Sequence, residues 1–123
     1  MKNIKIFFSN PNENIIEALR AYFKPLGYEL ILNDDLLRAA DEDFSLTDLI
    51  IMDPNMGDAG IATGVIDTLK SRIATSRIPI LLCSHQSNQE SIINGLNAGA
   101  SDFIQLPSPN RTLYKRIRAL LRQ

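Results

Sequence analysis

The feature that most constrains this chain's fold is a strict alternation between short apolar runs and segments with helical spacing. Five runs have the length of strands, namely residues 4–8, 28–32, 49–52, 78–83 and 103–104. The segments around them carry apolar residues three or four positions apart, which is the spacing of a helix. The five groups are Ile15, Ile16, Leu19 and Phe23; residues 36–40; Val65, Ile66, Leu69 and Ile73; Ile92, Ile93 and Leu96; and Leu113, Ile117, Leu120 and Leu121. This order predicts an α/β fold with five strands and five helices.

The alternation also predicts how the strands run. Each connection between parallel strands must cross over the sheet, and a helix is the usual crossover. The run 78–83, with the sequence IPILLC, fits a strand that is buried on both faces. We therefore predict a doubly wound parallel sheet with helices on both faces. No repeat or linker is visible, so we expect residues 1–123 to form one domain.

Charge and cysteine content narrow the function classes. Thirteen Lys and Arg against fourteen Asp and Glu give a net charge of −1, which predicts no nucleic-acid or membrane binding by this domain. The single Cys83 cannot form an internal disulfide, and the N-terminal segment turns polar before a signal peptide is complete, so we expect a cytoplasmic location. His85 is the only histidine, and no spacing suggests zinc. We expect no enzyme activity.

Polar side chains follow several of the predicted strands. Reactive groups collect at the carboxyl ends of strands in a parallel sheet, where loops meet the helices. We expect seven residues at these ends to line one pocket: Ser9, Asn10, Asp53, Asn55, Ser84, His85 and Leu106. One carboxylate, one imidazole and several hydroxyl and amide groups therefore converge.

Several segments resemble the receiver domains of bacterial two-component response regulators, and the resemblance covers essentially the whole chain. GLNAGASDFIQLP is similar to the family's stretch through the fourth helix and fifth strand, and KPLGYEL to the entry of the second strand. DLIIMD resembles the third strand, which presents the phosphoacceptor at Asp53, and IPILLCS the fourth, which ends at the Ser84 hydroxyl. The resemblance implies a flavodoxin-like sheet with strand order 2-1-3-4-5. It also places Phe103 at the family's switch aromatic.

The sequence departs from this family at three places in the pocket. The acidic pair that holds magnesium in the family is replaced by Ser9 and Asn10, and the lysine that pairs with the phosphoacceptor is replaced by Leu106. His85 stands where the family carries a small residue. A hard dication needs oxygen ligands, and a developing phosphoryl anion needs cations nearby. We therefore expect no cofactor and no specific magnesium binding.

Together these features favour a pseudo-receiver, a signal transduction domain that acts as a phosphorylation-independent protein interaction module. The expected partners are proteins: a histidine kinase, an attached output domain, or a second copy through the fourth helix, fifth strand and fifth helix. Two alternatives stay open: a functional receiver phosphorylated on Asp53 by a histidine kinase, and a small-ligand sensor that uses the vacated pocket near Leu106. Asp53 is then either an acceptor or a cap on the third strand, and Phe103 either core or docking surface.

Two charged segments remain. The last helix carries five cations, Arg111, Lys115, Arg116, Arg118 and Arg122. Such a run is either a solvated face, whose long stems cover apolar neighbours, or a contact surface for a partner. The acidic residues 41–43 predict a solvated loop near the second helix.

Overall fold

The computed structural model describes residues 2–8, 13–33, 35–56, 60–84 and 89–122. Its five strands are parallel and lie in the order β2-β1-β3-β4-β5, which confirms the predicted topology. The strands are β1 (Asn3–Phe7), β2 (Glu29–Asn33), β3 (Thr47–Met52), β4 (Ile80–Ser84) and β5 (Asp102–Gln105). The helices are α1 (Glu13–Phe23), α2 (Ile61–Ser71), α3 (Gln89–Ala98) and α4 (Asn110–Leu121), with 3-10 helices η1 (Lys24–Leu26) and η2 (Leu36–Asp41). No helix in these segments combines the length and apolarity needed to cross a bilayer.

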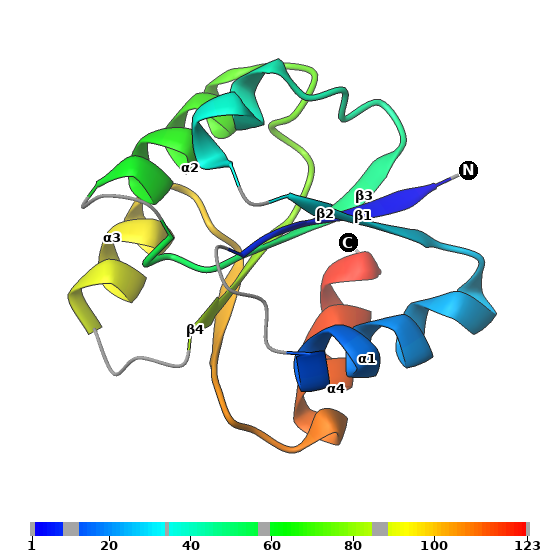
Figure 1. Cartoon of the computed structure of the whole chain (residues 1–123). Helices are drawn as coiled ribbons and strands as arrows, with labels where there is room; N and C mark the ends of the chain where they lie inside the picture. The colour runs from blue at the N-terminus through cyan, green and yellow to red at the C-terminus, as the bar shows by residue number, and fades with distance from the viewer. Residues whose placement is uncertain (1, 9–12, 34, 57–59, 85–88, 123) are drawn as a thin grey trace.

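The sheet separates two hydrophobic cores. Helices α1 and α4 cover one face, whereas η2, α2 and α3 lie on the other (Figure 1). Successive side chains of a strand point to opposite faces, so Ile4 and Ile6 enter the first core and Phe7 enters the second. The three central strands, β1, β3 and β4, are buried on both sides, because mostly apolar residues occupy both alternating positions. The edge strands β2 and β5 are partly exposed.

The second crossover departs from the prediction of five helices. Residues 36–40 lie in the 3-10 helix η2, so four α-helices occur in the described part of the chain. The buried side chains of η2, Leu36 and Ala39, are three positions apart, which matches the three residues per turn of a 3-10 helix. Six residues also gain few of the hydrogen bonds that stabilise an α-helix. Packing of these two side chains therefore decides the local conformation.

Helix α2 ends earlier than its apolar spacing predicted. Arg72 is extended, with φ −100° and ψ 135°, and its N–H donates to the Leu69 carbonyl at 3.4 Å. The Thr75 hydroxyl donates to the same carbonyl, so the loop and not a further helical turn satisfies it. Ile73, which the spacing had assigned to the apolar side of this helix, is consequently 97% exposed.

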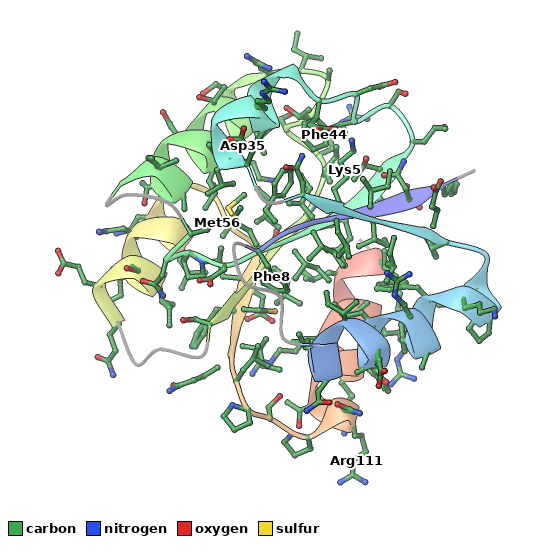
Figure 2. All side chains as sticks on the ribbon, viewed as in Figure 1. Lys5, Phe8, Asp35, Phe44, Met56 and Arg111 are labelled. Carbon is green, nitrogen blue, oxygen red and sulfur yellow. The ribbon has the colours of Figure 1, made fainter. Side chains whose placement is uncertain are left out.

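A partly buried ion pair joins β1 to the segment after η2. Lys5 lies in the middle of β1, is 4% exposed, and points into the second core, where its Nζ lies 5.2 Å from the centre of the Phe44 ring (Figure 2). Lys5 Nζ donates to Glu42 Oε2 at 2.6 Å, and Asn33 Nδ2 donates to Glu42 Oε1 at 2.7 Å. The expectation of a solvated acidic loop over residues 41–43 is therefore wrong for Glu42. Its carboxylate neutralises a lysine that the strand carries into the core.

Candidate functional site

Asp53 directly follows β3 at the carboxyl edge of the sheet and is partly exposed. Its N–H donates to the Phe7 carbonyl at 3.1 Å, which extends the contact between β1 and β3. Its Oδ1 accepts a hydrogen bond from the Asn55 N–H at 2.8 Å, and its carbonyl accepts one from the Met56 N–H at 3.1 Å. An aspartate that bonds the backbone two residues on closes an Asx-turn. The carboxylate therefore holds the loop that leaves β3.

Asn55 connects this turn to the neighbouring strand. Its Nδ2 donates to Ser84 Oγ at 3.0 Å, and Ser84 is the last residue of β4 and 2% exposed. The structure thus brings Asp53, Asn55 and Ser84 together across two adjacent strand ends, where the sequence placed them. Nothing in the sequence indicated the contact between the amide and the hydroxyl, because it depends on how far each loop extends beyond its strand.

Leu106 follows β5 and forms an apolar corner of the site. Its side chain is 7% exposed and packs in the first core with Phe8, Ile15 and Leu113. Its N–H donates to the Ser84 carbonyl at 2.7 Å, so the backbone is held against the end of β4. An isobutyl group offers neither charge nor a hydrogen bond. No cation therefore comes from this position.

A cavity lies beside Leu106, where the sequence suggested a vacated pocket, but sequence reasoning did not identify the other residues that line it. It has a volume of about 140 Å³ and is lined by Asn14, Ile15, Leu106, Pro107, Ser108, Asn110 and Leu113. The Ser108 Oγ atom is buried and has no hydrogen-bond partner among the described residues. In the sequence this segment is a short polar stretch before a helix, and only the approach of α1 to α4 creates the hollow.

The described residues do not form a set of metal ligands. No cluster of three or more His, Cys, Asp or Glu side chains that could hold a metal ion occurs in the described ranges. Asp53 forms no ion pair with any described residue. Magnesium in proteins is usually held by one or two carboxylates, with waters completing its octahedral coordination, and among the described residues Asp53 supplies a carboxylate at this edge of the sheet. Ser9, Asn10 and His85, which the sequence placed in this pocket, lie outside the described residues.

Cys83 is buried beneath the site, and its surroundings affect the pKa of its thiol. It lies in β4 next to Ser84 and is 1% exposed. Burial raises the pKa of the Cys83 thiol, and the negative charges of Asp53 and Asp102 act in the same direction. The folded state therefore favours the protonated thiol, and Cys83 packs as an apolar group of the first core.

Phe103 lies at the surface and not in the core. Its side chain is 39% exposed on β5, and its N–H donates to Asp102 Oδ1 at 2.8 Å. Both carboxylate oxygens of Asp102 accept hydrogen bonds from Arg116 Nη1, each at 2.8 Å. This ion pair ties α4 to β5.

Curated relatives match nearly the whole chain. The transcriptional regulatory protein CpxR of Escherichia coli K12 is 28% identical over 119 residues, which cover 97% of this chain and 50% of that protein. The nisin biosynthesis regulatory protein NisR of Lactococcus lactis is 26% identical over 120 residues, which cover 97% of this chain and 51% of that protein. The chain thus spans about half the length of these relatives.

Solved structures share the fold. A two-component response regulator from Clostridium difficile matches with a TM-score of 0.77 and 22% identity, over 100% of this chain and 98% of that one. The receiver domain of a sensor histidine kinase from Pseudomonas aeruginosa, solved with a magnesium ion coordinated in its active-site cleft, matches with a TM-score of 0.77 and 23% identity, over 99% and 98%.

The family assignment rests on the sequence as a whole. Residues 11–118 match the family described as the response regulator receiver domain. The strand order β2-β1-β3-β4-β5, with an aspartate directly after β3, agrees with that match. The chain therefore belongs to the receiver domains of response regulators, with an apolar residue, Leu106, at the end of its fifth strand.

Proposed function

We propose that this receiver domain serves two-component signalling as a protein interaction module whose contacts do not require a phosphoryl group on Asp53. The packing of Leu106 is the main support for this proposal. Its side chain belongs to the core between α1 and α4, at the position where the family resemblance implies a lysine. A leucine side chain that packs in the core supplies no charge to the site.

Charge balance gives the physical reason. A phosphoryl group adds roughly −1.5 to −2 charge at neutral pH, and a change of state requires contacts that differ between the two forms. Among the described residues no cation pairs with Asp53. Charge-assisted hydrogen bonds are the strong ones, and a leucine cannot make them. A phosphoryl group on Asp53 would therefore form few contacts that stabilise an active state over the unmodified one.

The hydrogen bonds of Asp53 support a structural role. Its Oδ1 is engaged by the Asn55 N–H, and the Asn55 amide in turn reaches Ser84. These contacts hold the loop after β3 against the end of β4 without any added group. A fixed shape at the strand ends suits an interaction module, because most preformed interfaces change little on binding.

Treatment with acetyl phosphate and magnesium tests the proposal, with intact mass and amide NMR around Ser84 and Phe103 as readouts. We expect no phosphoryl mass and no second conformational state. The comparison is the variant Ser9→Asp/Asn10→Asp/Leu106→Lys, which we expect to recover magnesium binding and some phosphorylation. The proposal fails if the unmodified protein gains the mass on Asp53 and shifts Phe103 as readily as the variant.

The first alternative is a working receiver phosphorylated on Asp53. The placement of Asp53 at the end of β3, linked through Asn55 to the Ser84 hydroxyl, favours it. A pull-down with Asp53→Asn separates the two functions. Capture of the same partners by this variant supports the interaction module, and their loss with the fold preserved supports the working receiver.

The second alternative is a small-ligand sensor, which the 140 Å³ cavity beside Leu106 favours. Apolar walls and the unpartnered Ser108 hydroxyl suit a small molecule with an apolar body and one polar group. An engineered cavity of about 150 Å³ in another protein holds benzene, so phenol is a suitable probe. Saturable NMR shifts at Leu113 on phenol addition, absent from Ser108→Val, would support this function.

The protein partners we propose are a histidine kinase, an output domain or a second copy of the chain. Because η2 replaces the second α-helix, the expected dimer face of the fourth helix, fifth strand and fifth helix corresponds to α3, β5 and α4. This face exposes Ile93 and Phe103, which are 54% and 39% exposed. Sedimentation of the wild type and of Ile93→Glu tests the homodimer, since a buried glutamate would dissociate it.

A further inference from the structure

Helix α4 and the residue that directly follows it carry four cations in one line. Arg111, Lys115, Arg118 and Arg122 are spaced by four, three and four residues, and Arg122 continues the helical backbone at φ −87° and ψ −9°. At 3.6 residues per turn these positions fall within an arc of about 60° and extend over about 17 Å. We call these four residues the basic stripe.

The basic stripe faces away from the protein. The buried side of α4 consists of Leu113, Ile117 and Leu120, which are 2%, 0% and 4% exposed. On the helical wheel the centre of the stripe lies about 160° from the centre of that buried side. All four stripe residues are exposed, and Figure 2 shows Arg111 pointing away from the body of the molecule.

No described carboxylate balances the stripe. Every Asp and Glu of the chain lies at or before Asp102, so the segment that contains α4 is purely basic. Arg116, which lies off the stripe, is the helix residue that pairs with Asp102, and the four stripe residues form no ion pair with any described residue. Without these four cations the net charge of −1 would be −5. Like charges three and four positions apart repel and weaken the helix, so the stripe is an unbalanced charge that a partner can neutralise.

We propose that the basic stripe is a docking surface for an acidic helical segment of a partner protein, with carboxylates at the same four-three-four spacing. Three of the four cations are arginines, whose planar forks bind carboxylates in pairs. A single straight row on one helix fits another helix, whereas the acidic remainder of the chain would repel the extended polyanion of a nucleic acid. The proposal deepens the proposed interaction role and rests on it, but it does not depend on the phosphorylation state of Asp53.

Fluorescence anisotropy tests the surface with a defined probe. The probe is a labelled, end-capped helical peptide of Ala, Gln and four Glu residues at the four-three-four spacing. The control peptide has the same composition with its Glu residues distributed around the helix. The test variant is Arg111→Gln/Arg118→Gln, and the matched control is Arg20→Gln/Lys24→Gln, which also removes two exposed cations but on α1 and η1.

We expect the striped peptide to bind the wild type about tenfold more tightly than the distributed peptide, with the stripe variant losing this preference and the Arg20/Lys24 control keeping it. The inference is overturned if both variants weaken binding equally, since net charge alone then accounts for it. It is also overturned if the striped peptide shows no preference, or if duplex DNA or phosphatidylserine vesicles compete more strongly than the peptide. No phosphodonor is present, so failure here leaves the mass and NMR test of the proposed function standing on its own.

Discussion

Removing the Glu42 carboxylate should destabilise the domain strongly, although Glu42 lies in a loop. The Glu42→Ala variant leaves the Lys5 ammonium, whose side chain is 5% exposed, without its ion-pair partner at 2.6 Å. It also removes the acceptor of the Asn33 amide. Breaking a fully buried pair costs roughly 3–5 kcal/mol, and an exposed pair contributes at most about 1 kcal/mol. Because the Glu42 side chain is 27% exposed, we expect a loss of about 2–3 kcal/mol.

The assay is urea and thermal unfolding followed by circular dichroism. For a domain of this size each kcal/mol lowers the Tm by roughly 4 °C, so the variant should melt about 10 °C below the wild type. Arg38→Ala is the control, because it breaks the pair between Arg38 and Asp35, whose side chains are 82% and 45% exposed, and should cost little.

A compensating variant separates charge from packing. Lys5→Met/Glu42→Leu replaces the ion pair with apolar groups, which in other proteins is often neutral or stabilising. We therefore expect the double variant to be clearly more stable than Glu42→Ala. A loss below about 1 kcal/mol for Glu42→Ala, or a double variant no more stable than the single one, would refute the reasoning.

Three further outcomes follow from other contacts. Because the pKa of the Cys83 thiol is raised in the folded state, only the unfolded chain ionises it near the ordinary value of about 8.5, so the free energy of unfolding should fall above that pH. Urea titrations from pH 7 to pH 10 should show this fall reduced in Cys83→Val, and parallel profiles would contradict it. Asn55→Ala removes the hydrogen bond to Ser84 and should cost about 1 kcal/mol in urea unfolding; a loss above about 3 kcal/mol would show a larger role. Gly95→Ala would place a Cβ atom 2.6 Å from Leu82 Cδ1 inside the second core. Although alanine has the better helix propensity, we expect this overlap to lower the free energy of unfolding by about 1–3 kcal/mol. A variant more stable than the wild type would show that the Leu82 side chain moves freely.

The local spacing of apolar residues predicted most of the fold. Apolar runs placed each strand within two residues of its observed bounds, and spacing of three and four located α1, α3 and α4. The same logic was wrong at the second crossover, where Leu36 and Ala39 pack in a 3-10 helix, and at Ile73, which lies beyond the end of α2. The first case is an element of only six residues, and the second lies two residues beyond the end of a helix. Local contacts outweigh the apolar pattern at both places.

The sequence by itself determined the α/β class and the strand-end positions of Asp53, Asn55, Ser84 and Leu106, because both follow from residue order. Only the tertiary structure decided which groups meet. Glu42 reaches Lys5 across 37 positions, and the Asn55 amide reaches Ser84 across 29. Such contacts depend on strand register and on how each loop closes, and a shift of one residue would turn every side chain of a strand to the other face. For that reason the ion pair inside the second core and the cavity beside Leu106 exist only in the folded chain.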